Sequence, residues 1–460
     1  MVRSAPLRVL VLLALAALAC GGPERPHGIV LLVIDTLRAD GLSAYGNPRP
    51  TTPNIDRLAE EGVLFEQAIS HTSWTLPGFV GLLSGSYPTR RVFEHRLSRS
   101  LVEDLAAAGY ATAAFTEGGY VSAHFGIDRG FGEFRELEGK VHLFGPDAPR
   151  KGPGGGGVAA TFDAASAWLR ANAARPFCLL VHTYEVHMPY LDRGLAEGLE
   201  PGGLPEVFNQ RVLGAVRRGD VIVGDTERAY VRALYEGGVA ATDHEVGRLL
   251  DLLAELGVAD RTVVVLTADH GEELGERTPT RLGMHGDALY DTLLRVPLVV
   301  RDPLHERAVQ RVSAQVRLVD VMPTILDLAG LPPPADVDGR SLVPLLRGAP
   351  DGDRPAYAEI PHPQSQLARR LAWRAQGWKL IVNVAPLAPG EAPSELYHLA
   401  DDPLETNDLS AREPARKEAL LERLRAQREA IDRAGRPVLG ADSDAPPALR
   451  AQLRALGYAQ

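Results

Sequence analysis

Two side chains able to bind a metal ion stand together directly after a predicted buried strand. Asp269 and His270 follow the apolar run Val263–Leu266, and Gly271 lets the chain turn away. Four successive branched apolar residues are typical of a strand covered on both faces of a parallel sheet. Open α/β sheets bind their ligands at the carboxyl ends of such strands. A carboxylate and an imidazole at this place therefore predict a reaction centre with a metal ion.

Two other apolar runs end in the same way. Residues 29–34 lead into Asp35, and residues 177–181 lead into His182. Because the carboxyl ends of parallel strands share one edge of a sheet, side chains far apart in the sequence can converge there. We expect Asp35 to supply a further oxygen ligand to the site of Asp269 and His270.

A hydroxyl group begins a short predicted helix. Pro77 lies near the start of this helix, Gly85 lies at its end, and Thr75 is placed at its N-terminus. Thr75 can simply cap the helix, which the local sequence alone favours. The same geometry also suits catalysis, because a cation and the positive helix end lower the pKa of a hydroxyl and make it a nucleophile. Both interpretations stay open at this level.

Three histidines lie close to the strand ends. His182 and His187 follow one strand, and His285 comes shortly after Asp269. Each of them alone is as consistent with a structural histidine as with a functional one. Their grouping around strand ends favours the functional interpretation.

The composition limits the class of protein. The chain has 460 residues, 45% of them hydrophobic, and a formal net charge of -10. This length and apolar content suit one large folded domain with a smaller one, and they exclude a disordered chain. The acidic balance and the absence of a Lys and Arg stripe argue against binding to nucleic acid.

Strands that alternate with helices indicate an α/β domain with a mostly parallel central sheet. We expect helices at 53–61 and 235–256 and a further strand at 296–300. The pattern changes near residue 354, where runs at 371–374 and 378–382 predict short antiparallel strands, followed by a charged helix at 411–434. The expected organisation is a main domain at 27–350, a subdomain of the same fold at 351–434, and a tail with a short helix at 435–460.

The first 19 residues are expected to be a signal peptide. Arg3 and Arg8 precede an apolar run at 9–19 that is too short to span a bilayer well. Cys20 then stands where a bacterial lipobox places the lipidated residue, although Ala17 departs from the preferred Leu. We predict an exported lipoprotein of the bacterial cell envelope, with a plain secreted protein and an uncleaved anchor as alternatives. Cys178 would be the one remaining cysteine, so no intrachain disulfide is expected.

Taken together, these segments resemble the sulfatase family of the alkaline phosphatase superfamily, nearly from end to end. The matching segments are Asp35–Asp40, Tyr45–Gly46, Thr51–Leu58, Gly62–Phe65, Leu82–Gly85, Tyr87–Pro88, Asp269–Gly271, His285–Gly286, Leu289–Asp291, Arg295–Pro297, Asp320–Thr324, Asp338–Leu342 and Glu395–Tyr397. The resemblance implies an alkaline-phosphatase-like α/β/α sandwich with a mostly parallel central sheet and a smaller C-terminal α+β subdomain.

The resemblance also implies a chemistry. One divalent cation would be held by Asp35, Asp269, His270 and Thr75. Ca2+ is the ion that the family favours, with Mn2+, Mg2+ and Zn2+ as alternatives. Thr75 would be the nucleophile, and His187 and His285 would contact the sulfuryl or phosphoryl oxygens or protonate the leaving group. The expected activity is metal-dependent hydrolysis of sulfate or phosphate esters of small molecules, glycans or lipids.

Several positions depart from the family pattern. Sulfatases carry Cys or Ser, oxidised to formylglycine, where this chain has Thr75, and threonine cannot be oxidised in that way. The basic residue four positions on is Phe79, the second acidic ligand is Thr36, and the family's Lys and His have no counterpart at 117–122. These departures leave three alternatives open. They are a phosphoglycerol- or phosphoethanolamine-type transferase of the cell envelope, a two-metal phosphodiesterase using His182, His187 and His285, and a catalytically degenerate binding protein.

Overall fold

A computed structural model describes residues 25–434, apart from 94–95, 138, 140–156, 306–307, 351, 353, 362–367 and 385–391. The expected signal peptide, Cys20 and the tail at 435–460 lie outside the described residues. In the described part of the chain, no helix has the length and apolar character needed to cross a membrane.

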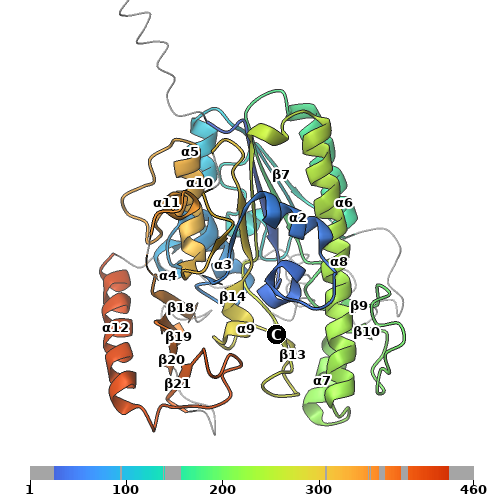
Figure 1. Ribbon diagram of the computed structural model, residues 1–460, viewed down its shortest axis with the longest axis vertical. Helices are drawn as coiled ribbons and strands as arrows, with labels where there is room; N and C mark the ends of the chain where they lie inside the picture. The colour runs from blue at the N-terminus through green and yellow to red at the C-terminus, as the bar shows by residue number, and fades with distance from the viewer. Residues whose placement is uncertain are drawn as a thin grey trace, which may run out of the picture.

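An eight-stranded sheet forms the centre of the main domain (Figure 1). In spatial order its strands are β16 (Arg311–Val312), β2 (Val63–Phe65), β15 (Leu298–Arg301), β11 (Thr262–Thr267), β1 (Gly28–Ile34), β8 (Phe177–Thr183), β6 (Ala111–Thr116) and β7 (Glu133–Glu136). β1 runs parallel to both β11 and β8, and every residue of these three strands is buried. The expected buried parallel strands are thus confirmed. β15 is the exception, because it runs antiparallel to both of its neighbours.

The strand expected at 296–300 is divided at Pro297. Val296 ends β14 (Arg295–Val296), which pairs with β3 (Ala68–Ile69) in a separate small sheet, and β15 begins at Leu298. Proline has no N–H for a strand ladder, so the chain changes sheets there. The prediction of one continuous strand was therefore wrong in this detail.

Helices cover both faces of the sheet (Figure 1). One layer contains α2 (Pro53–Glu61), α6 (Val158–Asn172) and α8 (Asp225–Glu255), and the other contains α3 (Thr75–Ser84), α5 (Leu101–Ala107) and α10 (Val321–Leu328). α8 begins at Asp225, ten residues before the expected Tyr235. The Glu227 carboxylate accepts a hydrogen bond from the Gly224 N–H at 2.7 Å, and this contact caps the N-terminus of the longer helix. The shorter elements are α4 (Pro88–Arg91), α7 (Gln210–Arg218), α9 (Asp291–Leu294), α11 (Val343–Leu346), β4 (Val92–Phe93), β5 (Arg96–Leu97), β9 (Tyr190–Leu191), β10 (Val207–Phe208), β12 (Glu273–Leu274), β13 (Leu282–Met284) and β17 (Val316–Arg317).

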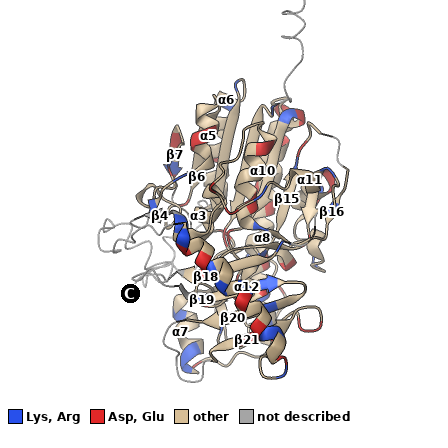
Figure 2. Cartoon of the chain, turned by 90° about the vertical axis from the view of Figure 1, so that its left-hand side faces the viewer, with Lys and Arg blue, Asp and Glu red and all other residues tan. Residues whose placement is uncertain are grey.

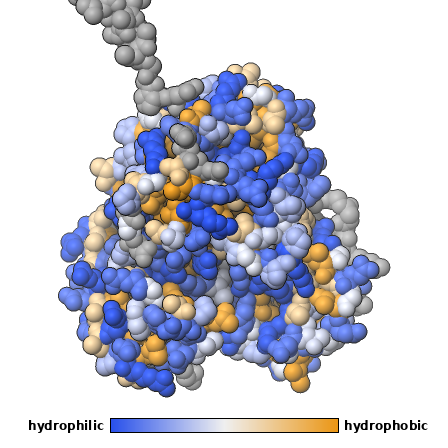
Figure 3. All heavy atoms as spheres, in the orientation of Figure 1, coloured by the Kyte–Doolittle hydropathy of each residue, from blue (hydrophilic) through white to orange (hydrophobic). Residues whose placement is uncertain are grey.

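A four-stranded antiparallel sheet and one helix form the C-terminal subdomain, as the sequence predicted. The strands are β18 (Ala356–Pro361), β19 (Ala368–Ala375), β20 (Trp378–Asn383) and β21 (Ser394–His398), and the helix is α12 (Pro414–Arg433). Leu420, Leu424 and Ile431 of α12 are buried, which places them on the face toward this sheet. Figure 2 shows charged residues of both signs along α12, and the surface in Figure 3 is largely hydrophilic with scattered apolar residues.

A buried ion-pair network joins the subdomain to the main domain. Lys379 of β20 is 0% exposed, and its Nζ lies 2.8 Å from Asp291 Oδ1 and 2.8 Å from Glu405 Oε1. Arg374 of β19 approaches the other oxygen of Asp291 at 3.0 Å. Asp291 begins α9 in the main domain, so the two parts share charges that are withdrawn from water.

Replacement of Lys379 by methionine should be strongly destabilising. The uncharged methionine side chain would leave Glu405 buried without its cation and Asp291 with one cation fewer, and breaking a buried pair in this way costs about 3–5 kcal/mol. Chemical unfolding measures the loss. The Lys417→Met variant on the partly exposed face of α12 should change the free energy of unfolding by less than about 0.5 kcal/mol. Equal stability of the two variants would contradict this role of Lys379.

Candidate metal centre

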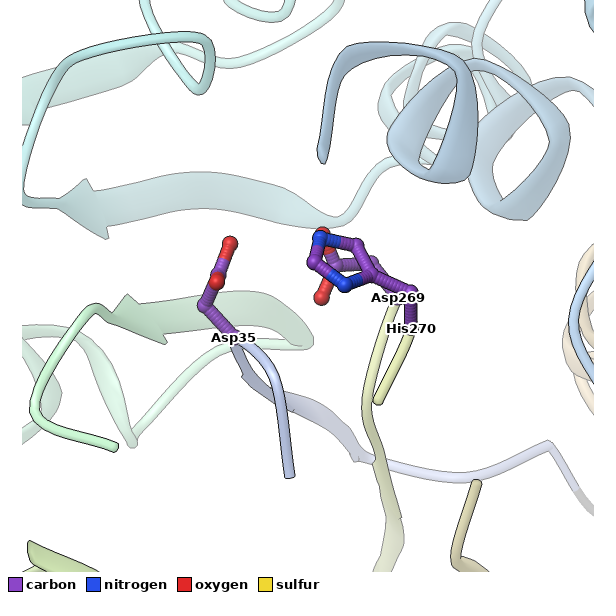
Figure 4. A group of neighbouring side chains, drawn as sticks. All are labelled: Asp35, Asp269 and His270. Atoms are coloured by element: carbon purple, nitrogen blue, oxygen red, sulfur yellow. The ribbon is translucent and has the colours of Figure 1, made fainter. Parts of the chain in front are cut away.

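The carboxyl ends of β1 and β11 bring the predicted ligands together. Asp35 follows β1, while Asp269 and His270 follow β11, and the register pairs Val33 with Thr267. Figure 4 shows the three side chains facing a common space. One ligand atom from each lies within 4.8 Å of the others. All three are 0% exposed.

The donor atoms of this cluster suit a divalent cation. Asp35 Oδ1 and both carboxylate oxygens of Asp269 are buried without a hydrogen-bond partner. Among the ion pairs of the described residues, these two carboxylates face only histidines. Burial and the neighbouring Asp35 raise the pKa of Asp269 well above its usual value. Buried charges of this kind are normally paired or bound to a metal ion, so the residues present fit the group.

His270 is oriented as a ligand. Its Nδ1 lies 2.8 Å from the Gly271 carbonyl oxygen, to which it donates. Nε2 therefore keeps its lone pair, and it lies 3.5 Å from Asp269 Oδ2. A hydrogen bond from the second ring nitrogen fixes the tautomer in this way at many metal sites.

Thr75 lies in the cluster and does not cap its helix. Trp74 occupies the N-cap position of α3, and Thr75 is the first helical residue. The Thr75 hydroxyl donates to Asp35 Oδ2 at 3.1 Å, and it lies 3.5 Å from His270 Nε2. The capping interpretation that the local sequence favoured was therefore wrong, because the helix begins one residue earlier than expected.

The close approach of α3 to the cluster depends on Gly78. A Cβ atom built on Gly78 would lie 2.9 Å from Asp269 Cβ. Real Cβ atoms essentially never approach so closely, so a larger residue would push the helix away from the strand end. Thr75 lies one helical turn before Gly78, and its distance to Asp35 depends on the same contact.

His285 and His187 lie beside the cluster. The His285 ring is 4.7 Å from the His270 ring and 4.9 Å from the His187 ring, measured between centroids. His187 Nδ1 donates to the Met188 carbonyl at 2.5 Å. His285 Nδ1 lies 2.8 Å from a Glu272 oxygen. Burial by itself lowers the pKa of His285, but the carboxylates of Glu272, Asp35 and Asp287 together outweigh burial, so the pKa of His285 is raised.

Glu272 is a site residue that the sequence analysis missed. It is 0% exposed, and besides His285 it accepts a hydrogen bond from the Tyr190 hydroxyl at 2.9 Å. Its place two residues after His270 was the available signal. That signal is weak, because an acidic residue in a loop is normally solvated.

The structure shows the contacts made at three positions where the sequence departs from the family pattern. The buried Phe79 ring packs edge-to-face on His182, with 5.0 Å between centroids. Thr36 has a φ of 57° and its hydroxyl donates to the Asp35 carbonyl at 2.7 Å. Glu117 accepts from the Thr183 hydroxyl at 2.6 Å and from the Tyr184 N–H at 3.0 Å. None of these contacts disturbs the three clustered ligands.

Comparison with known proteins identifies the family. The model of the sulfatase family matches residues 27–331, which is more than half of the chain. The chain belongs to the sulfatase family. The model of the C-terminal region of N-sulphoglucosamine sulphohydrolase also matches this chain, at residues 285–432. The family consists of sulfuric ester hydrolases that depend on a metal ion, in agreement with the cluster of Asp35, Asp269 and His270.

Curated relatives of this sulfatase-family chain cover most of its length. An N-acetylglucosamine-6-O-sulfatase of Bacteroides thetaiotaomicron is 25% identical, over 87% of this chain and 86% of the relative. An N-acetylgalactosamine-6-sulfatase of Canis lupus familiaris is 28% identical, over 76% of this chain and 72% of the relative.

Solved structures share the fold. One is BT4656 in complex with its substrate D-glucosamine-2-N,6-O-disulfate, with a TM-score of 0.70 and 23% identity over 89% of this chain and 98% of that one. The phosphonate monoester hydrolase of Agrobacterium radiobacter has a TM-score of 0.69 and 23% identity, over 88% of this chain and 96% of that one. The predicted α/β/α sandwich and C-terminal subdomain are thereby confirmed.

Substitution of Gly78 by alanine should loosen the site. Alanine is favoured over glycine in a helix by about 1 kcal/mol, but the added Cβ meets Asp269. We expect a lower melting temperature and a smaller rise of that temperature when a divalent metal salt is added. The matched control is Gly214→Ala in α7, where the added Cβ would meet only the end of the Arg218 side chain at 3.4 Å. If Gly78→Ala instead raised the melting temperature and left its rise with metal salt unchanged, the close contact of Gly78 with Asp269 would not be needed for the site.

Proposed function

We propose that this sulfatase-family chain hydrolyses sulfate or phosphate esters, with Thr75 as the nucleophile. Asp35, Asp269 and His270, together with the Thr75 hydroxyl, would hold one divalent cation. A bound cation there neutralises charge on the transferred group and lowers the pKa of a hydroxyl. The observation that carries the proposal is the position of the Thr75 hydroxyl, 3.1 Å from Asp35 Oδ2 and 3.5 Å from His270 Nε2.

The proposed reaction has two displacements. Thr75 Oγ1 loses its proton and forms a bond to sulfur or phosphorus, while the bond from that atom to the ester oxygen breaks and the alcohol leaves with a proton. Water then displaces Thr75 Oγ1 and releases sulfate or phosphate, and a proton of this water restores the Thr75 hydroxyl. His187 and His285 support these steps by contact with the oxygens of the transferred group or by donation of the proton to the leaving alcohol.

The threonine favours phosphorus over sulfur at the reacting centre. A Thr75 ester has to be cleaved by water, since the methyl group on its β-carbon excludes the formylglycine route. The phosphonate monoester hydrolases among the solved structures share the fold with this chain and show that the fold also serves phosphorus chemistry. Sulfated amino sugars are the substrates named for several relatives, so a glycan ester is the substrate class that we would test first.

Removal of the hydroxyl at position 75 tests the proposal. We expect metal-dependent turnover of an aryl sulfate, a phosphate monoester, a phosphodiester or a phosphonate monoester by the parent protein. Turnover should fall by at least about 10³-fold in Thr75→Ala, because the nucleophile is lost. Thr75→Ser should keep most of the activity. Mass spectrometry of quenched reactions should find the sulfuryl or phosphoryl group on the peptide that contains Thr75.

The control is Ser84→Ala, a second buried hydroxyl at the far end of α3. This variant should turn over substrate at the parental rate. Unchanged turnover in Thr75→Ala would refute the nucleophile. Absence of turnover with all four substrates would favour a binding protein, and transfer of the group to an added alcohol would favour a transferase.

We also propose that the chain is exported and lipid-anchored through Cys20. The basic and apolar segment before Cys20 supports this location. In a bacterial host, the parent should incorporate labelled palmitate and sediment with membranes, whereas Cys20→Ser should do neither. A Cys178→Ser variant is the control, since Cys178 is buried in β8. An unlabelled parent protein would rule out the anchor.

A further inference from the structure

Glu272 is a buried carboxylate whose charge partner is an imidazole. Its side chain is 0% exposed, and its Oε1 lies 2.8 Å from His285 Nδ1. Among the ion pairs of the described residues, Glu272 has this contact and none with a lysine or an arginine. A buried carboxylate is costly for folding, and replacing a buried ion pair by well-packed apolar residues is often neutral or stabilising. The stability of the fold therefore gives little reason for a glutamate at this position.

Two further contacts fix the orientation of Glu272. The Tyr190 hydroxyl donates to Oε2 at 2.9 Å, so each carboxylate oxygen has a partner of its own. Arg38 Nη1 donates to the backbone carbonyl of Glu272 at 3.0 Å. Tyr190 and Arg38 are both buried. The carboxylate is thus held firmly, two residues after the metal-site residue His270.

The contact with Glu272 also orients the His285 ring. When one nitrogen of an imidazole is bonded to a carboxylate, that bond sets the direction of the ring and the role of the other nitrogen. With Nδ1 bonded to Glu272, Nε2 is the nitrogen of His285 that can act on a substrate. The ring lies at the edge of the metal cluster, with its centroid 4.7 Å from that of His270.

We propose that Glu272 and Tyr190 are positioning residues, which hold His285 so that its Nε2 is available to the ester group that Thr75 attacks. The inference rests on the proposed function for the roles of His285 and Thr75. A buried carboxylate in a catalytic triad acts in the same way, because it keeps the histidine in the correct tautomer and orientation. Neither Glu272 nor Tyr190 has to touch the substrate, so their loss should affect turnover and not binding.

Steady-state kinetics of the full-length protein with a divalent metal salt test the inference, using whichever of the four esters above the parent turns over best. Glu272→Gln should lower kcat by at least about 100-fold and leave KM within about twofold, because an amide can donate to Nδ1 and favour the wrong tautomer. Glu272→Asp restores a carboxylate and should recover at least about 10-fold of this loss. Tyr190→Phe removes one hydroxyl and should lower kcat by about 10-fold.

The matched control is Glu273→Gln, the same substitution at the next residue. Glu273 is also buried, but its carboxylate pairs with Arg281. This variant should keep kcat within about twofold of the parental value. The free energy of unfolding is measured for every variant, to separate positioning from a structural role. Parental kcat in Glu272→Gln, or equal losses of kcat in the two glutamine variants, would overturn the inference.

Proton NMR tests the hydrogen bond without any substrate. An imidazole N–H that donates to a buried carboxylate resonates far downfield of ordinary amide protons. The parent should show such a signal, which should be absent from Glu272→Gln and from His285→Gln and should persist in Thr75→Ala. Its absence from the parent would overturn the inference. A parent that shows this signal but turns over no ester would refute the proposed function alone, because the signal establishes the contact between Glu272 and His285.

Discussion

Two carboxylates that are buried side by side are the constraint on which the site depends. Asp35 and Asp269 end adjacent strands, both are 0% exposed, and no lysine or arginine of the described residues pairs with them. Such an arrangement is unfavourable for folding unless a cation or a proton intervenes. The fold therefore holds a buried group of oxygen and nitrogen donors that could bind a divalent ion.

A series of contacts connects the C-terminal subdomain to the cluster of Asp35, Asp269 and His270. The Gly271 N–H donates to the Leu293 carbonyl at 2.7 Å, and the Gly271 carbonyl accepts from His270 Nδ1 at 2.8 Å. A Cβ on Gly271 would lie 2.2 Å from the Thr292 carbonyl oxygen, so only glycine fits there. Leu293 and Thr292 belong to α9, which begins at the Asp291 that Lys379 anchors. The C-terminal subdomain thus supports the orientation of His270.

Sequence patterns predicted well the elements whose environment is uniform. β1, β8 and β11 are buried along their whole length, so an unbroken apolar run marks each of them. Patterns failed where one residue changed the path of the chain or where a cap extended a helix. Pro297 moves the strand at 296–300 from one sheet to another. The Glu227 carboxylate caps α8 at Gly224, so the helix begins ten residues before the expected Tyr235. The N-cap of α3 fell on Trp74, which has no capping side chain and gave no signal.

The sequence by itself determined the family, the central sheet and the side chains able to bind a metal ion. Buried strands and sequence motifs can be recognised in this way because each is a short, continuous run of residues. It also named Thr75, His187 and His285 as candidates. Only the tertiary structure decided between a cap and a site residue for Thr75, since this depends on the 3.1 Å contact with Asp35, forty residues away in the chain. In the same way, only the structure revealed Glu272 beside His285 and the partnerless His182 beside Asp35. These contacts join separate strands and loops, and a linear pattern carries no information about distances between them.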